Sequence, residues 1–500
     1  QQMEGYLARE PLWKYQHLAW RAGFGVDRPT LLHWQSIPIK HVVKTLIRQR
    51  QSSPSILQTA EGQQLRAQWP SLRGRFLQLT QDEKKQLQKL QREGVKNLNL
   101  AWLQEMSTTS DSLREKMALF WHGHFACRVP NVLHNEQMLQ VIRENALGNF
   151  GDLLVAVSKS PAMLQFLNNQ QNRKQHPNEN FAREVMELFT MGRGHYTEQD
   201  VKEGARAFTG WGFNPQGEFV FRKNLHDDGV KHFLGKTGRF TGDDILQILL
   251  EQRATAYHVS EKIYRFLVND TPDPGQVQQM ANWFYDSGYD IATLLEKLFT
   301  SDWFYDTRHI GAHIKSPIEL MVGMQRTIPV SYRNPNIWLL FQRSLEQVLF
   351  YPPNVGGWPG GKSWIDSSSL MLRLRLPQVL YAGSIWNIRP KAMPDEIMDE
   401  DMLMQPEMHV DGEQQHIRDY LIHTVGGHMQ ATVQWDAYLR QFQDIPEEQL
   451  PMEIASLLLV NTPQDVDRNR ISTYADRSSR ERFIQSLTVL LMSTPEYQVC

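Results

Sequence analysis

Cysteine is nearly absent from this chain, whose 500 residues include only Cys127 and Cys500. A disulfide framework of the kind that stabilises small secreted domains is therefore excluded, and a single bridge is the most that the sequence allows. Paired CxxC motifs and a CxxCH haem site are also missing. With 41% apolar residues, the chain is long enough to bury an ordinary hydrophobic core instead.

An excess of positive charge is lacking as well, since the net charge is -2. A general nucleic-acid-binding protein needs more Lys and Arg to neutralise phosphates, so we expect no nucleic-acid partner. No apolar run approaches the roughly 18 residues that cross a bilayer, which predicts a soluble chain without a membrane span. The chain opens with Gln1-Gln2 rather than Met. This is typical of an exported protein after signal removal, although a trimmed chain would look the same.

Common nucleotide-binding and hydrolase motifs are missing too. The chain has no phosphate-binding GxxxxGK[ST] loop, no dinucleotide fingerprint, no serine nucleophile elbow and no zincin helix. The sequence thus carries no nucleotide, haem or flavin signature.

Residues that typically begin and end helices, in contrast, are frequent along the chain. Ser316-Pro317 places an N-cap before a proline, and Glu319 completes a capping-box pattern with it. The same spacing recurs at Thr197–Asp200 and Thr241–Asp244, and Gly192 stands where a left-handed C-cap would lie. We therefore predict an all-α fold built from many short to medium helices.

Strand patterns are confined to one short region. Residues 218–222 alternate polar and apolar side chains and 231–234 can pair with them, which predicts one small β-hairpin near 218–234. Further on, residues 394–413 hold eight acidic residues and no Lys or Arg, a composition typical of an exposed linker. The predicted regions are an N-terminal helical part (1–110), a core (111–385), an acidic linker (386–413), and C-terminal helices packed on the core (414–500).

Short motifs follow one another in a fixed order from about residue 12 to about residue 385. They are RAGFG (21–25), FWHGHF (120–125), PNENFARE (177–184), ELFT (187–190), TGW (209–211), HDDG (226–229), KSP (315–317) and PPNVGGWPGG (352–361). No single motif is specific, but the ordered set resembles the bacterial domain-of-unknown-function 1800 family (DUF1800). This resemblance implies an exported protein, periplasmic or extracellular, without an established activity. It also implies a companion protein of the DUF1501 family, which resembles alkaline phosphatases and sulfatases.

Two histidines stand at the end of a predicted helix that begins near Asp111. His124 continues the apolar face of this helix, whereas His122 lies about 200° away on a regular helix. If the helix continues, one histidine is a hydrogen-bonded core residue and the other is solvated. If the helix breaks at Gly123, both imidazoles turn into one cleft, as metal-ligating His-x-His pairs do in extended chain.

The helix predicted over 178–190 carries a polar stripe. Asn180, Arg183, Glu184 and Glu187 recur at helical spacing along one face. Glu184 and Glu187 could place two carboxylates beside a metal ion. Alternatively, Arg183 pairs with Glu187, and the stripe is a structural or solvated face.

Two further segments hold candidate residues. His226 and Asp227 stand in the predicted hairpin turn, either as ordinary turn residues or as a metal ligand or general base beside an orienting carboxylate. The loop 354–364 combines four glycines with Trp358 and Trp364. These residues either pack tightly under an aromatic lid or form a platform for a small-molecule or glycan ligand.

Two hypotheses about function remain open. In the first, the chain is a hydrolytic or oxidative enzyme whose divalent metal activates water or oxygen. In the second, it is a non-catalytic binding or assembly protein, and the same polar residues form a network that fixes helix packing. A metal site needs three side chains at about 2.0 to 2.3 Å from one point, whereas the network needs Arg183 bonded to Glu184 or Glu187. The predicted metal ligands are His122, His124, Glu184, Glu187 and His226, and the wider catalytic set adds Asn180, Arg183 and Asp227.

Overall fold

Helices dominate the computed structural model, which describes residues 9–72, 74–382, 431–460 and 468–500. Within these residues every strand belongs to one of three two-stranded sheets, so the predicted all-α class is confirmed. The predicted acidic linker at 386–413 lies outside the described residues. None of the helices in the described ranges combines the length and the apolar composition that a bilayer crossing requires.

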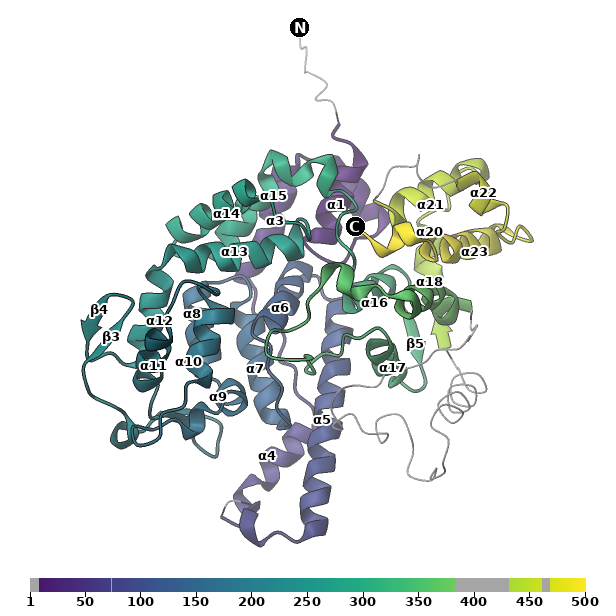
Figure 1. The fold of residues 1–500 in the computed structure, drawn as a ribbon. Coiled ribbons are helices and arrows are strands. Elements are labelled where there is room, and N and C mark those ends of the chain that lie inside the picture. Colours follow the sequence, from purple (N-terminus) through teal and green to yellow (C-terminus); the bar gives the residue numbers. More distant parts are fainter. Residues whose placement is uncertain (1–8, 73, 383–430, 461–467) are drawn as a thin grey trace.

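The first five helices include a two-helix arm that projects from the body (Figure 1). Figure 1 shows α4 and the adjoining part of α5 projecting from the body as a two-helix arm. Helix α5 begins at a complete capping box, in which Thr80 and Glu83 bind each other's backbone amides. The bounds are α1 (Leu12–Arg21), α2 (Arg28–Gln35), α3 (Ile39–Ile47), α4 (Ala60–Leu72) and α5 (Gln81–Thr108).

The remaining helices continue in short pieces on both sides of a central helix, α6. Before the four strands of residues 211–238 come α6 (Ser112–His124), α7 (Val132–Asn145), α8 (Phe150–Ser158), α9 (Pro161–Phe166), α10 (Asn180–Glu184), the π-helical turn η4 (Val185–Phe189) and α11 (Glu198–Ala207). After them come α12 (Gly242–Glu251), α13 (Arg253–Leu267), α14 (Pro274–Asp286), α15 (Ile291–Thr300), α16 (Pro317–Thr327), α17 (Ile337–Ser344), η8 (Gly361–Trp364), α18 (Ser367–Ala382), α20 (Asp436–Arg440), α21 (Leu450–Leu458), α22 (Arg468–Ser472) and α23 (Arg480–Met492).

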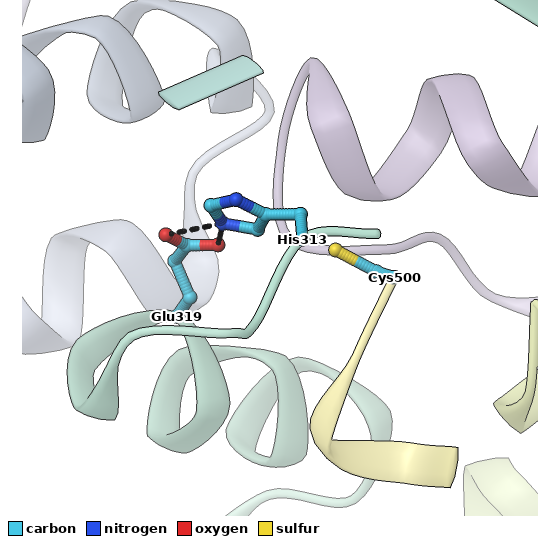
Figure 2. A group of neighbouring side chains, drawn as sticks. All are labelled: His313, Glu319 and Cys500. Carbon is cyan, nitrogen blue, oxygen red and sulfur yellow. Dashed lines mark hydrogen bonds and ion pairs between the residues drawn. The ribbon is translucent and has the colours of Figure 1, made fainter. Parts of the chain in front are cut away.

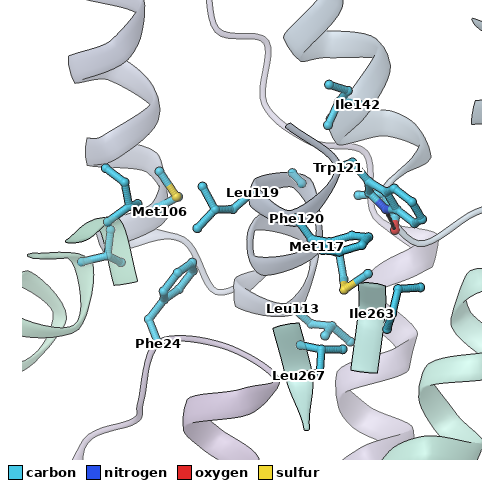
Figure 3. Packing of buried hydrophobic residues seen from close by; sticks show 14 of the residues in the cluster. Phe24, Met106, Leu113, Met117, Leu119, Phe120, Trp121, Ile142, Ile263 and Leu267 are labelled. Carbon is cyan, nitrogen blue, oxygen red and sulfur yellow. Dashed lines mark hydrogen bonds between the residues drawn. The ribbon is translucent and has the colours of Figure 1, made fainter. Parts of the chain in front are cut away.

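Helix α6 is buried on every side. Eleven of its thirteen residues are buried, whereas a helix on a protein surface buries one face only. Figure 3 shows Leu119 and Trp121 pointing to opposite flanks of this helix, toward Met106 and Ile142 respectively. Helix α6 is therefore the centre of the hydrophobic core, and residues near its end are held rigidly.

Three consecutive charged residues of α6 are buried with it, and each has a partner. Glu115 binds Nη2 of Arg143 on α7 at 2.7 Å, and Lys116 binds Glu319 on α16 at 3.0 Å. Arg114 donates to the backbone carbonyl of Arg143 at 2.8 Å. Because an unpaired charge in the core is strongly destabilising, these bonds fix α6 against α7 and α16.

Two hairpins replace the single hairpin predicted near 218–234. The predicted pairing of 218–222 with 231–234 is wrong, because each of these strands pairs with its nearest neighbour along the chain. Glycines with positive φ, Gly217 and Gly235, lie in the turns and allow each hairpin to close over a shorter loop than the predicted one. The pairs are β1 (Trp211–Phe213) with β2 (Phe219–Phe221), and β3 (Lys231–Phe233) with β4 (Lys236–Gly238).

The described part of the C-terminal region packs on the same core as the earlier helices. Strand β5 (Val330–Tyr332) pairs with β6 (Ala431–Val433). His313 and Cys500 exchange backbone hydrogen bonds of 3.1 and 2.8 Å, which bring the end of the chain beside the segment that leads into α16. Cys127 and Cys500 are both buried and free, so no bridge joins them.

Candidate functional site

A small pocket lies where α6, α13 and the start of α16 meet the glycine-rich loop 354–364. Its volume of about 160 Å³ is below the roughly 300 to 1,000 Å³ of ordinary ligand sites, so its natural occupant is small. Aromatic side chains form part of the wall. The titratable side chains that line it are His124, Lys262, Arg265, Asp270, His313 and Glu319.

Glycines allow the loop 354–364 to lie directly on the helices beneath it. Gly357 has a φ of +75°, and a Cβ there would overlap the carbonyl oxygen of Gly123 at the end of α6. Gly361 has a φ of +57°, and a Cβ there would overlap the carboxylate of Asp270. Side chains are therefore disfavoured at both positions by backbone conformation and by space. The loop forms a roof over the pocket that is held against α6.

Three of the residues predicted from the sequence lie in this pocket's wall: His124, Trp358 and Trp364. Trp358 also contacts the ring of His122, at 5.6 Å between centroids. Trp358 packs on His122, and both tryptophans line the pocket. That the loop forms a platform for a ligand stays a prediction.

Helix α6 continues through Gly123 to His124, so the two histidines do not turn into one cleft. The expectation that one of them would be solvated on an unbroken helix is wrong, because both are buried. Nε2 of His122 accepts the backbone N–H of Phe350 at 3.0 Å, and burial lowers the pKa of His122 to about 3. Nε2 of His124 lies 3.2 Å from the carbonyl oxygen of Phe189. Burial lowers the pKa of His124, and the nearby Lys262 adds to the shift.

The polar stripe of α10 and η4 forms ion pairs outside the pocket. Arg183 binds both carboxylate oxygens of Glu198, at 2.7 and 2.8 Å, and Glu179 at 3.3 Å. Glu187 pairs with the exposed Arg193 at 2.5 Å. The structural network that we considered required Arg183 bonded to Glu184 or Glu187. Neither bond forms, since Arg183 pairs with Glu198 and Glu179 and Glu187 pairs with Arg193.

The other two residues of the stripe are placed by local interactions. The backbone N–H of Asn180 donates to the side chain of Asn178 at 3.0 Å, whereas the N-cap residue Glu179 makes no side-chain capping bond. Glu184 is half-buried, and burial, with a contribution from Glu187, raises its pKa. Neither residue lines the pocket under the loop.

His226 and Asp227 hold the connection between the two hairpins against α11. Nδ1 of His226 lies 2.9 Å from the carbonyl oxygen of Thr209. Asp227 accepts a hydrogen bond from Nε of Arg206 at 2.8 Å and from the backbone of Gly229 at 2.9 Å. The bond to Arg206 lowers the pKa of Asp227 to about 2. Both residues lie outside the pocket lining.

The predicted metal ligands are thus dispersed over several elements. Among the residues described, the structure does not bring three of them together. His124 is the one that reaches the pocket. A metal ion held by this particular set of residues remains a prediction without geometric support.

A pair of buried residues that the sequence did not single out as functional lies in the pocket wall. His313 precedes α16, and Glu319 lies in the first turn of this helix. Nε2 of His313 lies 2.8 and 3.1 Å from the two oxygens of Glu319, as Figure 2 shows. Lys116 binds the same carboxylate at 3.0 Å, and Ser316 caps the helix by accepting the N–H of Glu319 at 3.2 Å. The capping box predicted at Ser316 is therefore half formed, because the Glu319 carboxylate has tertiary partners.

The protonation of this pair follows from its surroundings. Burial alone would raise the pKa of Glu319, but His313 and Lys116, both bonded to it, hold it well below its usual range. Burial lowers the pKa of His313, although Glu319 partly opposes the shift. An ionised carboxylate only accepts hydrogen bonds, so Nε2 of the neutral imidazole carries the proton. The lone pair of His313 is therefore on Nδ1, which has no hydrogen bond within the described residues.

Cys500 lies beside this pair and makes it a candidate metal centre. Ligand atoms of His313, Glu319 and Cys500 all lie within 4.8 Å of one another, and Figure 2 shows the thiol beside the histidine. A thiolate, an imidazole and a carboxylate form a donor set that suits a transition metal. The charges around this donor set do not favour a metal cation. Lys116 is bonded to Glu319, and Lys315 is buried nearby, between two aromatic rings.

The part of the pocket wall that α13 contributes is positively charged. Lys262 and Arg265 lie on α13, one turn apart. Arg265 donates to the backbone carbonyl of Asp270 at 2.9 Å and contacts Glu261 at 3.4 Å. Lys262 is half-buried and has no hydrogen-bond or ion-pair partner in the part of the chain that the structure describes. This wall can therefore accept an anionic group from a ligand.

Comparison with known proteins gives one match. A family model described as a protein of unknown function, DUF1800, matches residues 17–499, nearly the whole chain. No curated protein and no solved structure matches the chain.

Proposed function

The chain belongs to the DUF1800 family, whose description names no activity, and we propose a function from its pocket. The proposal is an acid–base enzyme that binds a small anionic substrate beneath the loop 354–364 and uses His313 as its general base. The observation that carries it is the bond from His313 to the ionised Glu319 in the pocket wall.

The chemistry follows from the tautomer of His313. Glu319 fixes the proton on Nε2 and stabilises the positive charge that develops when Nδ1 takes a second proton. The orienting carboxylate is held in turn by Lys116 and by the first turn of α16. A base with a free lone pair beside an orienting carboxylate meets two requirements of general base catalysis.

The substrate class follows from size and charge. The pocket has room for a small molecule. Its lining holds two cationic side chains, Lys262 and Arg265, while its acidic residues are Asp270 and Glu319, of which Glu319 is already paired. A substrate that carries a carboxylate or phosphate group would balance this charge. Proton abstraction from the carbon beside its carbonyl or carboxylate is the reaction that one base and one cationic wall support best.

The test uses the full chain in D2O with a panel of small carboxylates, oxo acids and phosphate esters. Deuterium incorporation or conversion is followed by NMR and mass spectrometry. We expect His313→Gln to lower the rate on any active compound by about 10² to 10⁴-fold, while the exposed His41→Gln variant matches the wild type. An active compound that His313→Gln processes at the wild-type rate would refute the proposal.

A transition metal at His313, Glu319 and Cys500 is a second candidate, favoured by the three ligand atoms within 4.8 Å. Such an ion would activate water or oxygen at the pocket wall. Metal content of protein from its native host should then fall on Cys500→Ser, a change that keeps the side chain's size. Stoichiometric metal in both proteins, or in neither, would count against this candidate.

Export and a DUF1501 companion are proposals that rest on the family alone. Fractionation of the native host, followed by co-purification from the exported fraction, would test both together.

A further inference from the structure

Lys262 is half-buried and differs from the two buried lysines near this pocket, Lys116 and Lys315. Lys116 is bonded to Glu319 and to the backbone of Trp20, and Lys315 lies between two aromatic rings, outside the pocket lining. Lys262 lines the pocket and, among the described residues, has no carboxylate partner. Its amine is thus the accessible one, and the structure needs it for no ion pair.

The environment of Lys262 favours the neutral amine. Lys262 lies in the pocket lining together with the apolar ring of Phe266. Burial lowers the pKa of Lys262 to about 8. About a tenth of the molecules then carry a neutral amine at pH 7, compared with about one in 2,500 for an ordinary lysine.

We propose that Lys262 is a nucleophile that forms an imine with the carbonyl group of a small oxo acid, whose carboxylate binds Arg265. Arg265 lies one helical turn from Lys262 on the pocket side of α13. This spacing places a cation beside the reacting amine, as an oxo acid requires. The inference rests on the proposed function and names the substrate class of the same pocket.

The reaction needs no oxidant or other co-reactant. The lone pair of the amine attacks the carbonyl carbon, a C–N bond forms, and the carbonyl π electrons move to oxygen, which takes up a proton. The C–O bond then breaks, and the oxygen leaves as water with the two protons that the amine has lost. The resulting imine withdraws electrons from the neighbouring carbon, whose proton Nδ1 of His313 can accept.

The experiment is trapping with borohydride. The full chain is incubated with pyruvate or glyoxylate and then reduced, and the adduct is measured by intact mass and located by peptide mapping. We expect one adduct per chain at residue 262, no adduct on Lys262→Arg, and an unchanged adduct on the exposed Lys202→Arg variant. No adduct on the wild type, or equal labelling of Lys262→Arg, would overturn the proposal.

Arg265→Gln gives a readout that does not depend on losing the amine. Half-maximal trapping should need about tenfold more oxo acid, because a charged hydrogen bond is lost, while trapping of acetaldehyde, which has no carboxylate, should not change. Equal effects on both carbonyl compounds would contradict the role of Arg265.

His313→Gln separates the two proposals. An adduct on this variant without deuterium exchange supports both. Exchange by the wild type without an adduct removes the imine alone, and an adduct with undiminished exchange on His313→Gln removes the general base alone.

Discussion

Nε2 of His313 lies 2.8 and 3.1 Å from the two oxygens of Glu319, so one histidine nitrogen faces a buried carboxylate while the other makes no hydrogen bond within the described residues. The bond joins the segment that precedes α16 to the first turn of that helix. Lys116 reaches the same carboxylate from the core helix α6. The base of the proposed enzyme is therefore positioned by a helix of the buried core.

This relationship predicts a single tautomer for His313. Because Glu319 is ionised and accepts, we expect the proton on Nε2 at pH 7, with Nδ1 unprotonated. NMR of protein labelled with ¹⁵N in its histidines measures the tautomer directly, and the His313→Gln spectrum assigns the signals. In Glu319→Gln the preference should weaken, since an amide can donate as well as accept. A wild-type signal from Nδ1–H would contradict the assigned role.

The buried pair of Glu115 and Arg143 predicts strong energetic coupling. Their closest atoms lie 2.7 Å apart, and Trp102 donates to the same carboxylate at 2.8 Å. Glu115→Leu and Arg143→Met should each lower the free energy of unfolding by about 3 to 5 kcal/mol, because each leaves a buried charge unpaired. Urea unfolding of both single variants and of the double variant measures this. The double variant should lose about 2 kcal/mol less than the sum of the single losses, and strict additivity would show that the pair is not coupled.

His122 predicts part of the protein's acid sensitivity. Burial lowers its pKa to about 3 in the folded state, while the unfolded value is about 6.5. Between these values the unfolded chain binds a proton that the folded chain does not, so stability falls as the pH falls, by about 1.4 kcal/mol per unit. His122→Gln keeps an acceptor for the N–H of Phe350 but does not titrate.

Unfolding free energies at several pH values provide the measurement. Between pH 6.0 and 4.5, the wild type should lose about 2 kcal/mol more than His122→Gln. The exposed His41→Gln variant serves as the control and should follow the wild type. Parallel curves for the wild type and His122→Gln would mean that His122 is protonated in the folded protein.

Local signals in the sequence predicted the helices well. The capping boxes at Thr197–Asp200 and Thr241–Asp244 are present, and Gly192 has a φ of +81°, as a left-handed C-cap requires. These patterns depend on side chains within three or four residues of each other, so the sequence contains all the partners. The predicted pairing of 218–222 with 231–234 was wrong because each of these strands also had another possible partner close by in the sequence.

The candidate site was predicted only in part, for a physical reason. The loop tryptophans and His124 were identified because their patterns are unusual in themselves. Glu319 looked like a cap, and the sequence cannot show that its carboxylate binds Lys116, 203 positions away. Arg183 and Glu187 looked like a site because they share a stripe, yet their partners lie on neighbouring segments. Tertiary partners decide which polar residue is functional, and spacing alone does not encode them.

Two glycines of the pocket roof predict a matched pair of variants. Gly357 and Gly360 both have a φ of +75°, so alanine strains the backbone at each position, and the ψ of −171° places Gly360 in a region that is essentially restricted to glycine. A Cβ at Gly357 would also overlap the carbonyl of Gly123, whereas a Cβ at Gly360 meets nothing within 4 Å. Both variants should lower the melting temperature, but Gly357→Ala should weaken oxo-acid trapping at Lys262 more than Gly360→Ala, because only the Cβ at Gly357 lifts the roof from α6. Equal trapping by the two variants would show that contact between the loop and Gly123 does not shape the pocket.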